Sequence, residues 1–165
     1  DGKRWTYFRN NNFSHNTLAI DGKIQYAAGE GKIITYDKNS SQPYFVIDMT
    51  SVYQGQAQAV KRTFTLTDDK TVTVTDRVDL LNDKQEITWN MITQAQVSCE
   101  GNVARLSKDG KKFRLTILAP ENAVFLTKPA KTTSDKEYPL IGYVLLQTKV
   151  SGSQEMEIKV QMNAE

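Results

Sequence analysis

Residues 13–20 (FSHNTLAI) contain the single imidazole of the chain, His15, just before an apolar stretch that ends in the turn Asp21-Gly22. An imidazole can bind a metal, transfer protons or simply hydrogen-bond. A catalytic triad also needs a nucleophile and an orienting carboxylate, and no nucleophile-elbow or reactive-cysteine motif accompanies His15. A self-contained metal site needs several ligands, so carboxylates such as Asp21 or Asp48 would have to join it. The residues alone favour a hydrogen-bonded His15 and leave a metal ligand open.

Two charged residues lie where the sequence pattern requires apolar ones. In residues 60–66 and 72–80 apolar and polar side chains alternate, and Arg62 and Asp76 fall on the apolar side. If the hairpin turns about Asp69, Arg62 lies directly opposite Asp76. Removing one partner of a buried ion pair costs about 3–5 kcal/mol, so each charge makes the other tolerable. We predict a structural Arg62–Asp76 ion pair; the alternative is that Arg62 points into a groove and binds an anionic sugar.

A short basic run, GKKFRL, occupies residues 110–115. Its spacing suits a sulfated polysaccharide. Lys111 and Lys112 also close a turn beside Asp109-Gly110, where outward lysines are ordinary solvated side chains. The sequence favours solvated surface lysines, with a polysaccharide contact as the alternative. From Arg105 to Glu165 the sequence otherwise indicates strands and turns, with no polar constellation.

The elements that must position these residues are strands. Apolar and polar residues alternate with period two in residues 71–75, 87–91, 113–117 and 156–162. Turn signals at the spacing of antiparallel neighbours separate the strands, at residues 21–22, 68–70, 82–84, 101–102 and 109–110. Residues 37–43 and 128–136 are expected to be surface loops. We predict an all-β antiparallel β-sandwich of about ten or more strands joined by short hairpins.

The composition is that of an ordinary globular domain. The 165 residues are 39% hydrophobic and 24% charged, which predicts one domain over residues 1–165. The formal net charge is +2 and basic residues are dispersed, so no nucleic-acid partner is expected. No apolar run reaches the roughly 18 residues of a membrane helix, so no membrane partner is expected. The single cysteine excludes an internal disulfide. The sequence starts at Asp1 and not at a methionine, which favours a piece cut from a longer protein.

The run RNNNFSHNTLAIDGKIQ at residues 9–25 resembles a signature of the heparinase II/III-like family of bacterial polysaccharide lyases, in which HNTL is followed by DG. The likeness continues through about the first ninety residues. Its further parts are residues 44–48 (YFVID), Tyr53, Arg62, residues 74–78 (VTDRV) and residues 87–89 (ITW). The HNTL segment is the specific part, and the later pieces are general β-sandwich sequence.

In that family an α-helical toroid precedes β-sheet domains, so the resemblance implies the C-terminal β portion of a polysaccharide lyase. Such lyases cleave glycans that contain uronic acids by β-elimination, with a Tyr and a His transferring protons while Asn or His neutralises the carboxylate. Those residues precede the HNTL segment, so no catalytic residue is expected in this chain. The implied partners are an upstream α-helical catalytic domain and, through it, an acidic polysaccharide. The implied location is periplasmic or secreted.

The resemblance also implies a metal role for His15. In some members the matching histidine binds a structural zinc together with a His and an Asp that precede this stretch, and the metal braces the sheet beneath the catalytic groove. His15 is therefore an expected zinc ligand in the full-length enzyme, with a hydrogen-bonded His15 as the alternative. Metal affinity falls steeply when two of three ligands are missing, so no zinc is expected in the isolated chain.

Arg9 and Asn16 flank the histidine and are candidates for sugar contacts in the full-length enzyme. Otherwise Arg9 is a solvated loop residue and Asn16 closes its own backbone turn. Trp5 and Tyr7 share one strand parity and could stack on sugar rings, or could have packed on a lost neighbour. The alternative function is therefore a noncatalytic carbohydrate-binding or interaction module.

Overall fold

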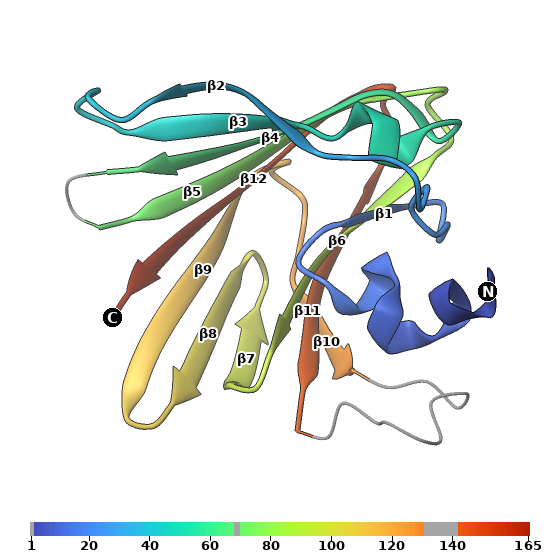
Figure 1. Ribbon diagram of the computed structural model, residues 1–165. Coiled ribbons are helices and arrows are strands. Elements are labelled where there is room, and N and C mark those ends of the chain that lie inside the picture. The colour runs from blue at the N-terminus through green and yellow to red at the C-terminus, as the bar shows by residue number, and fades with distance from the viewer. Residues whose placement is uncertain (1, 68–69, 131–141) are drawn as a thin grey trace.

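The computed structural model describes residues 2–67, 70–130 and 142–165, and their regular structure consists of β-strands and short 3₁₀ helices (Figure 1). This confirms the predicted all-β class. The strands are β1 (Leu18–Ile20), β2 (Lys32–Asp37), β3 (Tyr44–Asp48), β4 (Ala57–Leu66), β5 (Val72–Leu80), β6 (Glu86–Thr93), β7 (Gln96–Glu100), β8 (Val103–Lys108), β9 (Lys111–Ala119), β10 (Leu126–Pro129), β11 (Val144–Ser151) and β12 (Glu155–Ala164).

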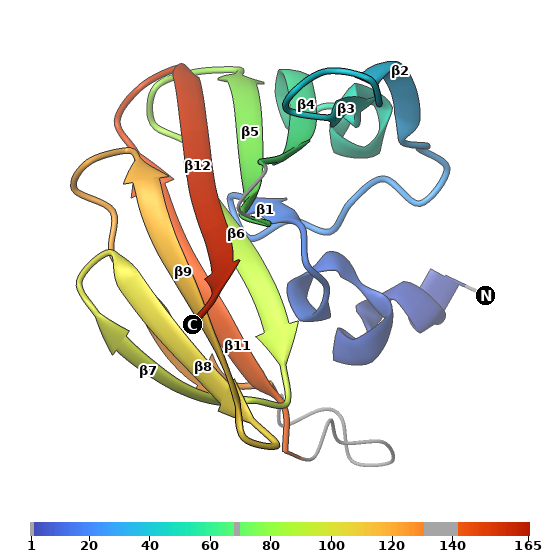
Figure 2. The same ribbon diagram turned by 90° about the vertical axis from the view of Figure 1, so that its left-hand side faces the viewer.

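The strands form two antiparallel sheets. The smaller sheet has the order β1-β6-β11-β10, and the larger has the order β2-β3-β4-β5-β12-β9-β8-β7. Figure 2 shows them as two layers, with β9 and β12 of the large sheet in front of β6 and β11 of the small one. The inward side chains of both sheets share one core, which includes Ile87 and Trp89 from the small sheet and Val60, Leu115 and Ile158 from the large one. The predicted sandwich is confirmed.

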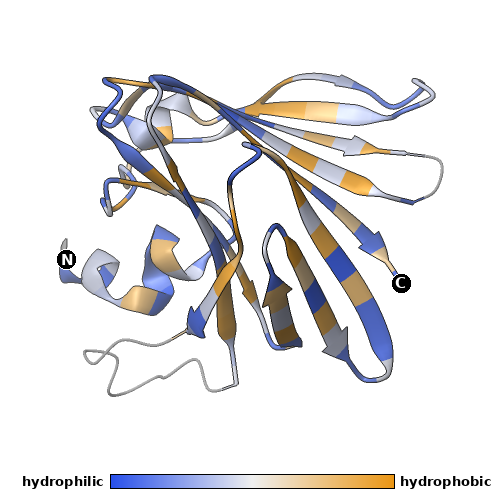
Figure 3. Ribbon diagram, turned by 180° about the vertical axis from the view of Figure 1, so that it is seen from behind, coloured by the Kyte–Doolittle hydropathy of each residue, from blue (hydrophilic) through white to orange (hydrophobic). Residues whose placement is uncertain are grey.

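Side-chain alternation explains why these segments are strands. In β9, Phe113, Leu115 and Ile117 pack on the core, while Lys112 and Arg114 lie on the other parity. Figure 3 shows the resulting hydrophilic and hydrophobic bands along the strands of the large sheet. Asp109 and Gly110 have φ of 51° and 76° and join β8 to β9, which fits the type I′ turn that suits a two-residue hairpin.

Two-residue hairpins join β7 to β8 and β8 to β9, as predicted, whereas residues 49–56 with η4 join β3 to β4 and several other connections cross between the sheets. Residues 81–85 lead from β5 in the large sheet to β6 in the small one, and residues 94–95 lead back to β7. A turn signal is local, so it does not reveal whether the next strand pairs with the previous one or crosses to the other layer. Lys128 and Pro129, expected in a loop, belong to β10. Residues 68–69 and 131–136 of the expected turn and loop lie outside the described residues.

The N-terminal segment consists of η1 (Gly2–Thr6), η2 (Phe8–Asn10) and η3 (Asn12–Ser14). Phe8 is buried with Ala130 and Leu145 in a second apolar cluster, on the opposite parity of β11 from core residue Leu146. The prediction that Trp5 and Tyr7 lie on the same side of one strand is therefore wrong, because this segment forms 3₁₀ helices and no strand. Within the described ranges, no helix is long and apolar enough to cross a membrane.

The large sheet leaves an open apolar face over β2, β3 and β4. These strands reach beyond the small sheet (Figure 1), and a hollow of about 970 Å³ lies over them. Tyr36 is 67% exposed and Ile33 is 63% exposed. Phe45 and Phe64 stack there with ring centroids 4.8 Å apart. Exposed apolar surface of this kind marks an interaction site more often than a solvated face.

Candidate functional site

Arg62 on β4 and Asp76 on β5 form a buried ion pair. They lie directly opposite each other, in the register that the sequence pattern predicts. The Nε of Arg62 donates to Oδ1 of Asp76 at 2.6 Å, and Nη2 donates to Oδ2 at 2.8 Å. Arg62 is 7% exposed and Asp76 is fully buried. Two parallel charge-assisted hydrogen bonds hold the guanidinium in one orientation, directed inward rather than into a surface groove.

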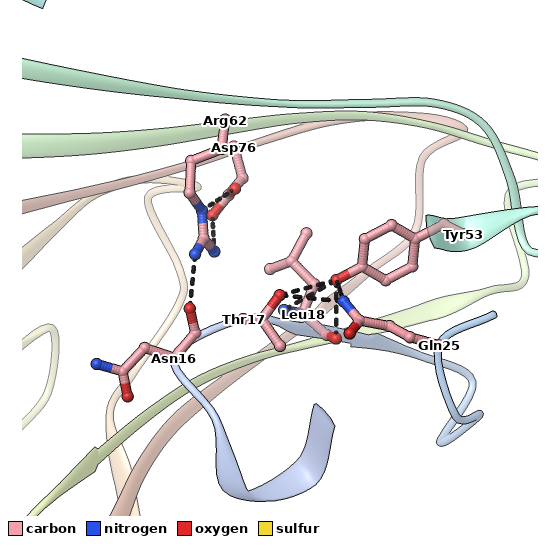
Figure 4. Close-up of polar contacts among 7 residues, drawn as sticks. All are labelled: Asn16, Thr17, Leu18, Gln25, Tyr53, Arg62 and Asp76. Carbon is pink, nitrogen blue, oxygen red and sulfur yellow. Dashed lines mark hydrogen bonds and ion pairs between the residues drawn. The ribbon is translucent and has the colours of Figure 1, made fainter. Parts of the chain in front are cut away.

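The pair also connects the two sheets. The third donor, Nη1 of Arg62, donates to the backbone carbonyl of Asn16 at 2.7 Å, so a side chain of the large sheet holds the segment that leads into β1 (Figure 4). Burial raises the pKa of the Asp76 carboxyl, and the Arg62 guanidinium opposes that rise. Burial also disfavours the charge on Arg62, but attraction to Asp76 outweighs it and raises the pKa of the guanidinium. The two charges therefore depend on each other.

Asn16 extends the β1–β6 pairing by one step. The backbone carbonyl of Thr17 accepts from the N–H of Asn90, and the side-chain Oδ1 of Asn16 accepts from the N–H of Ile92 at 2.8 Å. The side chain thus replaces the backbone carbonyl that a longer β1 would offer. The expectation that Asn16 closes its own turn is wrong, because its oxygen bonds a residue of another strand.

The hydroxyl of Tyr53 closes the free edge of β1. Tyr53 lies in η4 (Thr50–Tyr53) and is fully buried. Its hydroxyl accepts from the N–H of Leu18 at 3.2 Å and donates to the carbonyl of Leu18 at 3.0 Å. Nε2 of Gln25 donates to the same oxygen at 2.7 Å, and Thr17 Oγ1 lies 3.0 Å away (Figure 4). Burial raises the pKa of the Tyr53 phenol, which keeps it neutral and able to donate.

Asn12 organises the same segment from the other side. It is 3% exposed, and its Nδ2 donates to the carbonyls of Leu18 at 3.2 Å and Lys23 at 3.1 Å. Its Oδ1 accepts from the N–H of Gln25 at 3.1 Å. One buried amide therefore satisfies three backbone groups of the loop around β1.

His15 follows η3 directly and is exposed. Its backbone N–H donates to the Asn12 carbonyl at 3.4 Å, and its own carbonyl accepts from the N–H of Thr17 at 2.9 Å. The imidazole makes no hydrogen bond within the described residues. Its backbone is thus positioned by neighbours while the ring faces solvent, so the sequence-based alternative of a hydrogen-bonded imidazole does not describe this arrangement.

The carboxylates considered as co-ligands are engaged elsewhere. Asp21 accepts from Nε2 of Gln85 at 2.9 Å and from the N–H of Glu86 at 3.0 Å, and these bonds lower the pKa of its carboxyl. Asp48 accepts from the N–H of Thr50 at 2.8 Å, and hydrogen bonds to Thr50 lower the pKa of this carboxyl too. Among the described residues, no three His, Cys, Asp or Glu side chains come together in a group that could hold a metal.

Arg9 lies apart from the Arg62–Asp76 pair, in η2. Its guanidinium carbon is 5.3 Å from the centroid of the Tyr7 ring, and Arg4 stacks similarly on Trp5 at 4.5 Å. Trp5 is 37% exposed and Tyr7 is 42% exposed. Each of the two aromatic rings has a guanidinium cation on its face, so this end of the chain presents positive charge that suits an anionic partner.

Three residues of this site were not predicted as site residues from the sequence: Asn12, Gln25 and Tyr53. All three belong to the segments that carry the family resemblance, which is the signal that could have singled them out. Their contacts were hidden because Tyr53 and Leu18 are 35 positions apart in the chain. Together with Arg62 and Asn16, these residues form a rigid platform around residues 12–18 that presents His15 to solvent.

Residues 1–157 match the sequence profile of a family described as "Heparinase II/III-like, C-terminal". No curated protein sequence matches the chain. Several solved structures share the fold. A "Heparinase III-BT4657 gene product" superposes with a TM-score of 0.73 at 15% identity, covering 99% of this chain and 25% of that one.

A structure named "Heparinase III" superposes with a TM-score of 0.71 at 13% identity over 97% of this chain and 24% of its own. The heparan sulfate lyase HepC from Pedobacter heparinus gives a TM-score of 0.67 at 11% identity over 92% of this chain and 24% of its own. The chain thus spans about a quarter of the length of these structures. The superpositions establish a common fold, and at identities this low they establish nothing beyond the fold.

Proposed function

We propose, since this chain belongs to the heparinase II/III-like, C-terminal family, that it is the C-terminal β-sandwich of a polysaccharide lyase acting on uronic-acid-containing glycans. In β-elimination a base removes the C5 proton of the uronate, its electron pair forms the C4–C5 double bond, and the C4 oxygen leaves with a proton from an acid. The catalytic acid and base belong to the part of the enzyme before Asp1. The present chain scaffolds the groove and supplies one metal ligand.

The presentation of His15 is the observation that carries this proposal. The backbone on both sides of the ring is held by Asn12, by Thr17 and, through Asn16, by the buried Arg62. An exposed imidazole on a rigid backbone is preorganised to bind a metal with little further loss of conformational freedom. His15 would supply one nitrogen to a zinc ion whose other ligands lie outside this chain. The zinc would fix the platform against the groove of the full-length enzyme.

Arg9 and Asn16 are the proposed substrate contacts. The oxygen of Asn16 already accepts from Ile92, so only its amide N–H groups are left to meet a sugar oxygen. Arg9 would offer a guanidinium to a uronate carboxylate or a sulfate. Both residues lie within the same N-terminal segment as His15, and the proposal requires that they reach the same groove of the full-length enzyme.

The proposed partner within the enzyme is an upstream α-helical catalytic domain. The open apolar face over β2, β3 and β4 has the composition of a surface that packs on another domain, with Tyr36 and Ile33 more than half exposed. We also propose that the full-length enzyme works in the periplasm or is secreted, because polymeric acidic glycans lie outside the cytoplasm. Cell fractionation tests that location.

The test uses a full-length enzyme that carries the residues preceding Asp1. We expect heparan sulfate or a related uronate-containing glycan to give the ultraviolet absorbance of an unsaturated uronate. Purified enzyme should contain zinc, and His15→Ala should lower the bound zinc by metal analysis. Lys3→Ala, an exposed change in the same segment, is the matched control and should retain full zinc.

Two outcomes would contradict the proposal. A folded full-length enzyme without unsaturated product on any uronate-containing glycan would reject the lyase assignment. Equal zinc content in the enzyme and its His15→Ala variant would reject the metal role while leaving the lyase assignment standing.

A second candidate function is a noncatalytic carbohydrate-binding module. The exposed rings of Trp5 and Tyr7, each with a guanidinium on its face, favour it. If the 165-residue chain alone were retained on a column of immobilised acidic glycan and Trp5→Ala abolished retention, this candidate would gain over the scaffold role.

A further inference from the structure

Two arginines lie directly opposite each other on the outer face of the large sheet. Arg105 of β8 pairs in register with Arg114 of β9. Like charges at directly opposed positions of an antiparallel pair are destabilising unless something neutralises them. Arg105 contacts Glu100 and Glu165, each at the long distance of 3.8 Å. Arg114 has no carboxylate partner among the described residues, and its Nε is buried without a hydrogen bond there.

The strand register identifies what surrounds the pair. The inward positions of β7, β8 and β9 pack on the core, so the alternate positions share the outer face. Asn163 of β12 lies opposite Arg114 on its other side, and Ser98 of β7 lies opposite Arg105. Further residues of this outer face are Gln96, Ser107, Lys112, Thr116 and Gln161. The immediate surroundings are therefore hydroxyls, amides, a lysine and the apolar Val103 opposite Thr116, with the two glutamates beside Arg105.

Lys112 extends the positive charge toward the β8–β9 turn. It lies opposite Ser107, one outward position from Arg114, and is exposed. A hollow of about 520 Å³ lies beside these residues, and its polar lining consists of Gln96, Ser98, Arg105, Ser107, Lys112 and Glu165. The one carboxylate in this lining, Glu165, lies 3.8 Å from Arg105. We define Arg105, Lys112 and Arg114, with the hollow beside them, as the arginine face.

We propose that the arginine face binds the sulfate or carboxylate groups of an acidic glycan chain. Guanidinium forks match the planar or tetrahedral oxygens of such anions and bind them in pairs of hydrogen bonds. The neighbouring serine, glutamine, threonine and asparagine side chains suit sugar hydroxyls. The outer-face residues named above include no aromatic ring, so stacking of nucleic-acid bases has no platform here. An anion between the arginines would also relieve their repulsion.

This assigns a ligand to the basic run at residues 110–115, on a different surface from His15 and the platform around β1. The choice of a glycan as the polyanion rests on the proposed function. The observation that Arg105 and Arg114 lie opposite each other is independent of that function. A surface of this kind would hold a polymeric substrate near the enzyme while the groove cleaves it. It would also work in the 165-residue chain without any catalytic domain.

The test measures binding of heparin, as a sulfated-glycan probe, to the 165-residue chain by affinity chromatography and by titration at fixed salt. Arg114→Gln and Lys112→Gln should each weaken heparin binding by about three- to tenfold and elute at lower salt. The matched control is Lys32→Gln on β2, which removes the same charge and should leave binding unchanged. Because Arg114 faces a like charge, Arg114→Gln should not lower the melting temperature, whereas a merely structural arginine would.

If Arg114→Gln unfolds the chain, the exposed Lys112→Gln alone decides the matter. If Lys32→Gln weakened heparin binding as much as Lys112→Gln does, the loss would reflect net charge alone and the proposal would be overturned. Undetectable heparin binding to the unaltered chain would also overturn it. Equal competition by duplex DNA at matched charge would overturn the assignment to a glycan. Loss of lyase activity in a full-length His15→Ala enzyme with unchanged heparin binding would separate this inference from the proposed function.

Discussion

Nη1 of Arg62 donates to the backbone carbonyl of Asn16 at 2.7 Å, while the rest of the guanidinium is bound to Asp76. One buried cation therefore satisfies a carboxylate of its own sheet and a backbone carbonyl of the segment that leads into β1 of the other sheet. This relationship positions the segment that carries His15, because Asn16 is its immediate neighbour in the chain. The sandwich and the candidate site thus depend on the same ion pair.

Arg62→Ala should strongly destabilise the chain. It would leave the Asp76 carboxylate buried without its partner and the Asn16 carbonyl without its donor, at a cost of about 3–5 kcal/mol. Urea denaturation monitored by tryptophan fluorescence measures this loss. The double replacement Arg62→Met with Asp76→Leu should recover much of it, because no buried charge remains. A loss below about 1 kcal/mol for Arg62→Ala would show that the pair contributes little.

Tyr53→Phe should destabilise the chain by about 1–3 kcal/mol, because the N–H and carbonyl of Leu18 would lose their shared partner in a buried place. Chemical denaturation measures the difference. Tyr44→Phe is the matched control, since Tyr44 is 36% exposed and lies at the open apolar face. Equal effects of the two changes would argue against a special role for the Tyr53 hydroxyl.

Asn16→Ala should release the N–H of Ile92, and Asn16→Asp should keep it bound, since aspartate retains the accepting oxygen. A lost hydrogen bond of about 0.5–1.5 kcal/mol corresponds to faster amide exchange by up to about tenfold. Hydrogen exchange at Ile92, followed by nuclear magnetic resonance, measures it. Similar exchange at Ile92 in the Asn16→Ala variant and the unaltered chain would contradict this bond.

Asp21→Asn should reveal a pH-dependent contribution to stability. Hydrogen bonds from Gln85 and from the N–H of Glu86 lower the pKa of Asp21 in the folded chain. A carboxyl with a lowered folded pKa stabilises the fold above its unfolded pKa of about 3.9, and this contribution disappears as the pH falls through the folded pKa.

The stability difference between the chain and its Asp21→Asn variant should therefore be present at neutral pH and vanish in acid. It should stay below about 1 kcal/mol, because the Asp21 side chain is 31% exposed to water. Asparagine tolerates the positive φ of 50° at this position, so backbone strain does not confuse the comparison. A difference that grows as the pH falls would have the wrong sign.

The pattern of side chains along the chain was sufficient to identify the strands and one of their contacts. Alternating side chains in β5, β6, β9 and β12 identify strands because one sheet face is buried and the other is wet. The same parity placed Arg62 opposite Asp76, since hairpin register follows from local spacing. The HNTL segment carried the family resemblance.

The layer that each strand joins, and the distant residues that meet, became known from the packing of the folded chain. The crossing from β5 to β6 has a turn signal like that of a hairpin, because turns report local backbone geometry. The Tyr53 hydroxyl finds Leu18 only when η4 packs against β1. The local turn at Asp109-Gly110 sets Arg105 opposite Arg114, but only the packing buries the Nε of Arg114 without a hydrogen bond among the described residues. The Tyr53–Leu18 contact joins a side chain to backbone groups that carry no pattern along the chain, so only packing of the two sheets brings them together.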